Sequence, residues 1–208
     1  MLSIRHFCKR YHQRAVLVID SLDFPAGAYW IQGENGSGKS TFFKAIAGLI
    51  PFEGTIAYNG FDNRKHRIAF HQALSYAEAE PLYPDMLTAH DLISFAAGIK
   101  KVGDDDYARL MAALGIGNFQ YQPVRTFSSG MLKKLSIALA LLGEPQLVIL
   151  DEPYITLDSE TREILDKLLI KHLERGATFL FSSHQAPAIN ILPITACYRI
   201  TAQQLVRV

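Results

Sequence analysis

The sequence predicts an α/β fold: a core with a mostly parallel sheet, an N-terminal antiparallel β region, and an inserted helical subdomain. Three observations support this. A glycine-rich loop at 33–41 joins an apolar strand to a helix, a second apolar strand at 147–150 ends in two carboxylates, and residues 88–142 have helical spacing. A single domain over residues 1–208, with its helical insertion at about 85–145, accommodates all three.

The first part of the chain predicts strands. Residues 1–27 carry alternating and short apolar runs between polar turns, as in an antiparallel strand with one exposed face, and residues 54–60 look like another piece of the same region. A buried strand at 28–32 precedes a helix at 40–47, which Gly48 and Pro51 should end.

Helices should dominate the middle of the chain. Thr88 and Asp91 form a capping-box pattern before one apolar helix, and residues 104–114 should form another. The α/β pattern then returns. Its elements are a strand at 147–150, a helix at 159–175, a strand at 178–182 and a β segment from Ile194.

Composition narrows the functional classes. The 208 residues are 49% hydrophobic and carry a net charge of only +1, which gives no broad attraction to nucleic acid or anionic lipid. Cys8 and Cys197 lie at opposite ends with no C-x-x-C spacing, as expected in a reducing cytoplasm. The longest apolar runs are about half of the ~20 residues that a membrane span needs. We therefore expect that the protein has no nucleic-acid partner, does not insert directly into the membrane and is not itself exported from the cell.

The loop at 33–41 is a complete G-x-x-x-x-G-K-S sequence in a strand-loop-helix context, which predicts a P-loop NTPase core. Its backbone N–H groups should surround the β- and γ-phosphates at the positive end of the helix, Lys39 should add a positive charge, and Ser40 should bind Mg²⁺. A glycine-rich turn beside a solvated lysine is the alternative, which the full spacing disfavours. The nucleotide-binding residues expected here are Gly33, Asn35, Gly36, Ser37, Gly38, Lys39, Ser40 and Thr41.

Two later strand ends should complete the site, because ligands of parallel sheets bind at the carboxyl ends of the strands. Asp151 is expected to act on Mg²⁺ through a water or from just outside its ligand sphere, and Glu152 is placed to polarise a water that attacks the γ-phosphate. His184 follows the strand at 178–182 and can orient that water. A solvated strand end and a surface histidine are the alternatives.

Between these parts lies Phe127-Ser128-Ser129-Gly130-Met131, directly before the expected helix 132–140, and here the chain resembles the ATP-binding cassette (ABC) family, whose signature is L-S-G-G-Q. The resemblance covers nearly the whole chain. It also includes Tyr11 at the adenine-stacking position and Asp158 after an Ile-Thr-Leu turn. It implies the ATP-binding subunit of an ABC transporter, an ATPase that uses ATP and Mg²⁺.

Three positions depart from the family pattern. Ser129 replaces a common glycine and should be tolerated if its φ is negative, whereas Met131 replaces a glutamine and removes a polar contact. The family usually has a glutamine near Mg²⁺ or the attacking water after the first half of the core. Glu78 best fills that position, as a catalytic and metal-binding carboxylate, with Gln72 as the less favoured choice.

The resemblance also implies that two copies, or this chain and a homologue, sandwich two ATP molecules head to tail. Ser128, Ser129, Gly130 and Asp158 would serve the nucleotide held mainly by the other subunit. Such a dimer opens after hydrolysis and can drive a separately encoded transmembrane permease from the cytoplasmic face of the membrane. The cargo, the direction of transport and the choice between homodimer and heterodimer stay open, although the altered signature is a faint hint towards exporters.

The segment 81–87 is the candidate docking site for the permease, being apolar and rich in proline. Alternatively, Leu82, Tyr83 and Met86 only cap the core of the insertion. A soluble single-cassette ATPase acting in macromolecular assembly is the main functional alternative. A P-loop kinase is disfavoured by the signature and by Glu152, which suits water as the acceptor.

Overall fold

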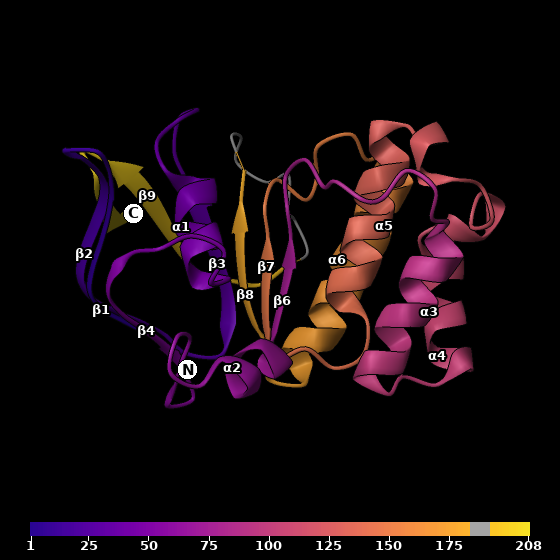
Figure 1. The fold of residues 1–208 in the computed structure, drawn as a ribbon, viewed down its shortest axis with the longest axis horizontal. Coiled ribbons are helices and arrows are strands. Elements are labelled where there is room, and N and C mark those ends of the chain that lie inside the picture. The colour runs from indigo at the N-terminus through magenta and orange to yellow at the C-terminus, as the bar shows by residue number, and fades with distance from the viewer. Residues whose placement is uncertain (184–191) are drawn as a thin grey trace.

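The computed structural model describes residues 1–183 and 192–208, and in these residues one sheet runs through the molecule with helices packed against it (Figure 1). The strands form a ten-stranded sheet in the order β5-β4-β1-β2-β10-β9-β3-β8-β7-β6. They are β1 (Leu2–Tyr11), β2 (Arg14–Phe24), β3 (Gly27–Gln32), β4 (Glu53–Tyr58), β5 (Phe61–Asp62), β6 (Leu74–Ala77), β7 (Leu147–Leu150), β8 (Thr178–Ser182), β9 (Ile194–Thr201) and β10 (Gln204–Arg207).

The described helices follow the predicted order, with additions. They are α1 (Lys39–Ile46), α2 (Arg67–Ala73), α3 (Ala89–Lys100), α4 (Asp104–Ala113), α5 (Ser129–Leu141) and α6 (Ser159–Glu174), with 3₁₀ turns η1 (Ile116–Asn118) and η2 (Val124–Thr126). Helix α2 was not predicted. It is short, and its N-cap residue His66 makes no side-chain capping bond, so the usual start signal is missing.

The sheet has the predicted mixed character. Strand β1 pairs antiparallel with β2 and β4, whereas β3, β6, β7, β8 and β9 are joined by parallel ladders. In the first half of β1 the buried side chains are Leu2 and Ile4, and in the second half they are Phe7 and Lys9, with Ile4 and Phe7 fully enclosed. This confirms the α/β fold class with an N-terminal antiparallel region.

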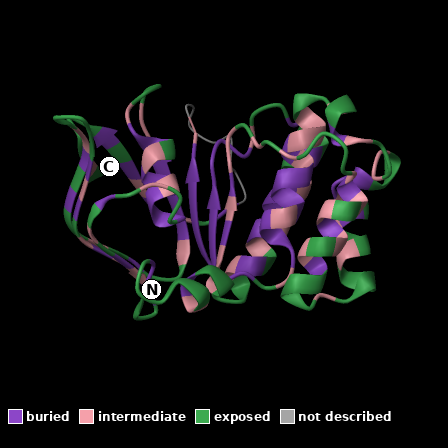
Figure 2. Ribbon diagram, in the orientation of Figure 1, coloured by how far each residue is buried: buried purple, intermediate pink, exposed green. Residues whose placement is uncertain are grey.

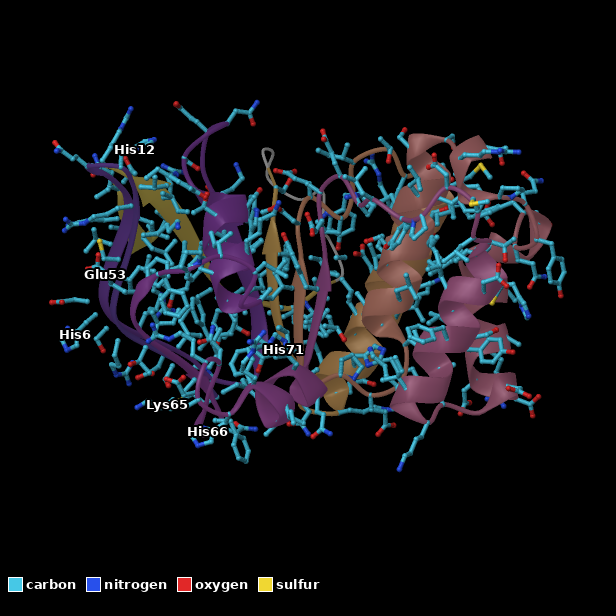
Figure 3. All side chains as sticks on the ribbon, viewed as in Figure 1. His6, His12, Glu53, Lys65, His66 and His71 are labelled. Atoms are coloured by element: carbon cyan, nitrogen blue, oxygen red, sulfur yellow. The ribbon has the colours of Figure 1, made fainter. Side chains whose placement is uncertain are left out.

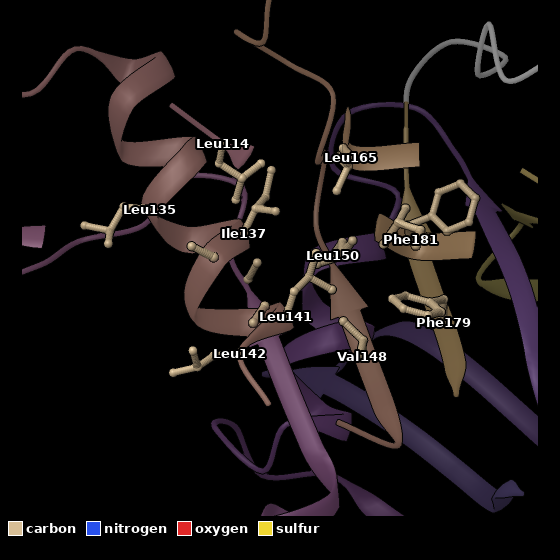
Figure 4. Packing of buried hydrophobic residues seen from close by; sticks show 14 of the residues in the cluster. Leu114, Leu135, Ile137, Leu141, Leu142, Val148, Leu150, Leu165, Phe179 and Phe181 are labelled. Atoms are coloured by element: carbon tan, nitrogen blue, oxygen red, sulfur yellow. The ribbon is translucent and has the colours of Figure 1, made fainter. Parts of the chain in front are cut away.

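Two hydrophobic clusters hold helices against the sheet. On one face, Phe42 and Phe43 of α1 pack with Phe7 of β1. On the other, Leu135 and Leu141 of α5 belong to the cluster that contains Val148 and Leu150 of β7 and Phe179 and Phe181 of β8 (Figure 4). Each large apolar side chain that is fully enclosed contributes about 1.5–3 kcal/mol. The middle strands are buried almost throughout, while the outer surfaces of α3 and α4 are exposed (Figure 2).

The segment between β6 and β7 is helical, as predicted. At the start of α3 the Thr88 hydroxyl accepts the Asp91 N–H and the Asp91 carboxylate accepts the Thr88 N–H, which confirms the capping box. Helix α5 begins at Ser129, three residues earlier than expected. The second half of the signature is therefore the first turn of that helix.

The parallel ladders bring several chain segments to one edge of the molecule. Strands β6, β7 and β8 all point to the upper edge in Figure 1, where the loop before α1 and the start of α5 also lie. In parallel sheets this carboxyl edge is where ligands bind.

Candidate nucleotide-binding site

The loop between β3 and α1 is shaped by two glycines with positive φ. Gly36 has φ 75° and Gly38 has φ 111°, and a Cβ on Gly38 would lie 3.0 Å from Val16 Cγ1. Gly38 is the N-cap of α1, so no side chain caps that helix, and its first turn has no acidic residue. The N–H groups and the positive end of α1 are thus left for a phosphate group.

Lys39 is the buried cation of this loop. Its Nζ donates hydrogen bonds to the Gly33 carbonyl at 2.7 Å and the Glu34 carbonyl at 3.2 Å. Burial lowers the pKa of Lys39, and the carboxylates of Glu152 and Asp151 act in the opposite direction. The strand-end acids are therefore close enough to act on the lysine, as a shared phosphate site requires.

Asp151 and Glu152 follow β7 directly, and both are buried, at 2% and 7% exposure. The Ser182 hydroxyl, at the end of β8, donates to Asp151 Oδ1 at 2.5 Å and accepts the Glu152 N–H at 2.9 Å. Glu152 has φ 51°, an uncommon backbone conformation for a residue with a side chain. Burying two carboxylates is costly unless they are bonded or serve a ligand, so this pair marks a functional site.

A magnesium ion fits the oxygen groups present. Ser40 lies exposed in the first turn of α1, Asp151 follows β7, and Glu78 follows β6. Magnesium is typically held by one or two carboxylates together with substrate phosphates rather than by a protein cage. Residues 1–183 and 192–208 contain no group of three or more His, Cys, Asp or Glu side chains arranged to hold a metal.

Glu78 and Gln72 have different positions. Glu78 lies directly beyond β6, at the carboxyl edge, and its Oε2 is 3.2 Å from Lys44 Nζ of α1. Gln72 lies within α2, before β6, and is exposed. The placement favours Glu78 for the position that faces the phosphates, and its role stays a prediction.

Tyr11 ends β1 beside the phosphate loop. It pairs with Arg14 across the β1–β2 ladder, and Val16 of β2 touches the loop at Gly38. The ring is half exposed, and Lys9 Nζ lies 4.5 Å from its centroid. Stacking on adenine stays a prediction.

A hollow of about 850 Å³ lies along the outer flank of the loop. Its lining comes from the start of β2, from residues 32–37 and from residues 199–203. The lining thus includes the first half of the phosphate loop, whereas Lys39, Asp151 and Glu152 lie outside it. The exposed residues Asn35 and Gly36 at the tip of the loop line the hollow. Ser40 and Thr41 lie in the first turn of α1 and are not part of the lining.

The signature residues form the exposed start of α5. Ser128 is the N-cap, and its Oγ accepts the Met131 N–H at 3.3 Å, which leaves the hydroxyl proton for another acceptor. Ser129 is helical with a negative φ, so the condition for tolerating this serine is met. A Cβ on Gly130 would lie 3.0 Å from the Thr156 carbonyl oxygen, so the signature packs closely on the segment after Glu152.

Asp158 connects the same two segments. Its Oδ1 accepts the Thr161 N–H at 2.8 Å as the N-cap of α6, and its Oδ2 lies 3.3 Å from Lys134 Nζ of α5. The backbone hydrogen bond from Thr161, supported by Lys134, lowers the pKa of Asp158 to about 2. The side chain thus has structural partners within its own subunit in addition to its predicted role towards a second one.

His184 lies outside the described residues. Ser182 and Ser183 lead directly to it from the end of β8, at the edge where the carboxylates lie. Of the other histidines, His6, His12, His66 and His71 lie along the antiparallel strands and α2, away from the ends of β7 and β8 (Figure 3).

Sequence reasoning missed the residues that hold the site together. Ser182 was recognised only as a strand end, and no motif singled out Lys44, Lys133 or Lys134. The parallel pairing of β7 with β8 places Ser182 beside the acids, which a sequence without its sheet order does not reveal. Helical spacing could have placed Lys133 on the inner face of α5.

Comparison with known proteins agrees with this geometry. Residues 20–155 match the family model described as ABC transporter. The chain is 33% identical over 186 residues to the lantibiotic transport ATP-binding protein SrtF of Streptococcus pyogenes, covering 88% of this chain and 80% of that protein. It is also 33% identical over 162 residues to the cytochrome c biogenesis ATP-binding export protein CcmA of Nitrosococcus oceani, covering 77% of this chain and 74% of that protein.

The fold is also similar to that of a solved structure. A solved structure of an ATP-binding subunit of an ABC transporter superposes with a TM-score of 0.89 at 24% identity, covering 98% of this chain and 87% of that one. The chain belongs to the ABC transporter family, as an ATP-binding protein. It is an ABC ATPase, which binds ATP and hydrolyses it. Across the two described stretches, every helix is too short or too polar to cross a membrane.

Proposed function

We propose that residues 1–208 form one ATPase domain, with its helical insertion at about 85–145, that dimerises head to tail around two ATP molecules and drives a separately encoded transmembrane permease. The observation that carries this proposal is the shared carboxyl edge of the sheet. There the uncapped start of α1, the buried Lys39 and the Ser182-bonded pair of Asp151 and Glu152 come together.

Hydrolysis would use these groups in distinct roles. The α1 N–H groups and Lys39 hold the β- and γ-phosphates, and Glu152 polarises a water in line with the γ-phosphate. His184, from the next strand end, orients that water. Ser40, Asp151 and Glu78 would hold Mg²⁺, which supplies charge neutralisation to the phosphate oxygens when bound.

The position of the signature supports a second subunit, because α5 packs in the cluster on one face of the sheet and α1 packs in the cluster on the other face. The loop follows β3, whereas α5 packs on the side of β6 and β7, and three interstrand spacings separate β3 from β6. At about 4.8 Å each, this is roughly 14 Å. Ser128 would therefore meet the γ-phosphate held by the partner rather than its own, as a homodimer or a heterodimer with another ABC subunit. Loss of the bridging γ-phosphate opens the dimer.

The permease would dock on the segment between Glu78 and α3. Leu82 is 95% exposed and Met86 is 87% exposed, so neither caps the core of the insertion. Tyr83 differs, because it packs against the cluster formed by α5 and its neighbours, and burial raises its pKa. The alternative, in which this segment only caps the core of the insertion, therefore applies to Tyr83 alone. The exposed Leu82 and Met86 support docking. The complex would place this subunit on the cytoplasmic face of the membrane.

Export is the direction that the comparisons favour. SrtF is described as a lantibiotic transport protein and CcmA as an export protein, each at 33% identity. The cargo would be chosen by the permease.

The test is a pull-down of tagged Glu152→Gln protein from its own cells in gentle detergent with Mg²⁺-ATP. We expect a co-purifying chain with several apolar spans of ~20 residues. A Leu82→Asp, Met86→Asp double variant should lose this chain and keep its basal ATPase. Ile68→Asp is the matched control, since Ile68 is 79% exposed on α2. Recovery of soluble partners alone would contradict transport and favour the assembly class.

A further inference from the structure

Lys133 is a buried lysine in the second turn of α5, with 3% of its surface exposed. Its Nζ donates to three backbone carbonyls: Ala79 at 2.6 Å, Glu78 at 3.2 Å and Asp151 at 3.3 Å. An ammonium group has three N–H donors, so all of them are used. Burial lowers the pKa of Lys133, while Asp151, Glu152 and Glu80 oppose the shift. A buried charge with this many bonds is a specific arrangement, because an unsatisfied one would be costly.

The three carbonyls belong to the two strand ends that carry proposed metal ligands. The ladder between β6 and β7 reaches Ala77 and Leu150, and one further bond joins the Asp151 N–H to the Ala77 carbonyl at 2.8 Å. The β6–β7 ladder ends with this bond. Lys133 bridges the two strand ends at that point, immediately after the last backbone hydrogen bond between them.

The same lysine belongs to the signature helix. Lys133 lies five residues after Ser128, which is about 7.5 Å along a helix axis. Ser128 is the N-cap of α5, and residues 129–133 are the first five residues of that helix. A displacement of the start of α5 would therefore reach the carbonyls of Glu78, Ala79 and Asp151 through the helix and the Lys133 side chain.

We infer that Lys133 is a positioning residue that sets the Glu78 and Asp151 carboxylates for Mg²⁺ according to the position of the signature end of α5. This inference rests on the proposed function of the site. Lys133 would thus link two parts of the site. One is the start of α5, which would meet the partner's nucleotide, and the other is the pair of strand ends at Glu78 and Asp151, which would hold the metal of the subunit's own nucleotide.

The test compares nucleotide binding with and without the metal, which requires no turnover. The affinity for the non-hydrolysable analogue AMP-PNP is measured in Mg²⁺ and in EDTA. The dissociation constant in EDTA divided by that in Mg²⁺, here called the Mg²⁺ ratio, gives the coupling to the metal. Lys133→Met should lower this ratio about tenfold or more, in the range found when residues that orient metal ligands are removed. The dissociation constant in EDTA should stay within about twofold, because the phosphate loop is unchanged.

Lys100→Met is the matched control. Lys100 Nζ also lies between the insertion and β6, but it contacts Ser75 Oγ at 3.0 Å and the Leu142 carbonyl at 3.0 Å, away from the Glu78 loop. This variant should lower the melting temperature and leave the Mg²⁺ ratio unchanged. Lys133→Arg, which keeps the charge and the donors, should restore most of the ratio.

A double-mutant cycle separates a positioning role from general loss of structure. If Lys133 acts through Glu78, adding Lys133→Met to Glu78→Ala should change the Mg²⁺ ratio much less than it does in wild type. Lys133→Gln serves the same purpose if the methionine variant does not fold. An unchanged ratio in Lys133→Met, or an equal loss in Lys100→Met, would overturn the inference. Absence of any Mg²⁺ effect in the wild type would instead count against the proposed function.

Discussion

The Ser182 hydroxyl donates a 2.5 Å hydrogen bond to Asp151 Oδ1 and accepts the N–H of Glu152 at 2.9 Å. One serine of β8 thus orients the proposed metal ligand and the backbone of the proposed catalytic carboxylate. All three residues are buried, so solvent does not replace either bond when the hydroxyl is removed.

Ser182→Ala should therefore lower kcat about 10- to 100-fold with little change in ATP affinity measured in EDTA. Leaving the Glu152 N–H without its acceptor should also lower the free energy of unfolding by about 1–3 kcal/mol. Steady-state ATPase assays and urea denaturation measure the two effects. Ser182→Thr keeps the hydroxyl and should recover most activity, and full activity in the alanine variant would contradict the assigned role.

Glu78→Ala should reduce hydrolysis about 10- to 100-fold, whereas Glu78→Gln should stay within a few-fold of the wild type, because an amide oxygen can replace one carboxylate oxygen near the metal. The bridge to Lys44 is partly exposed and worth only about 0–1 kcal/mol, so neither variant should unfold the protein. Mg²⁺ titrations of ATPase activity distinguish them. Equal activity of the alanine variant and wild type would exclude Glu78 from the metal site.

Gly130→Ala should weaken ATP-dependent dimerisation about tenfold or more, since the added Cβ would press on the Thr156 carbonyl and displace the start of α5, at a cost of about 1–3 kcal/mol. Ser129→Gly, which restores the glycine that is common in the family at this signature position, is the control. Ser129 is exposed and helical, so this change should alter the free energy of unfolding by less than about 1 kcal/mol and leave dimerisation intact. Sedimentation of both variants in the Glu152→Gln background measures the effect. Equal dimerisation of the two would argue against close packing at Gly130.

Asp158→Asn should destabilise the protein in a pH-dependent way. The Thr161 hydrogen bond and Lys134 lower the pKa of Asp158 to about 2, so its charge contributes stability above its unfolded pKa near 3.8, and this is lost as the pH falls towards 2. Asparagine keeps the capping bond and removes the charge. The free energy of unfolding, measured by urea denaturation, should differ between wild type and Asp158→Asn at pH 5–7, and this difference should shrink below pH 4. A difference independent of pH would contradict the charge assignment.

Much of the fold could be predicted from the sequence because its elements carry local signals. The capping box at Thr88 and Asp91, the loop glycines Gly36 and Gly38, and the apolar strand before Asp151 each depend on neighbouring residues only. The start of α5 was placed too late, because Ser128 caps a helix whose first turn contains a glycine and has little apolar periodicity.

The residues that connect the site could not be predicted in the same way. Ser182, Lys44 and Lys133 act through partners 31, 34 and 54 positions away in the chain. Those pairings exist only once the sheet order places β6, β7 and β8 side by side. Long-range contacts between single polar groups leave no periodic pattern in a sequence.

The most direct test of the central claim is the mass of Glu152→Gln protein in solution by light scattering, with Mg²⁺-ATP and with Mg²⁺-ADP. We expect a mass near twice 23.2 kDa in ATP and a single-chain mass in ADP. Adding Lys39→Ala should abolish the ATP dimer, because the phosphate loop then loses its buried cation. A Glu152→Gln protein that binds ATP at saturation and remains monomeric would contradict a homodimer. If titration with a homologous ABC subunit also gave no dimer, ATP-dependent dimerisation as a whole would be contradicted.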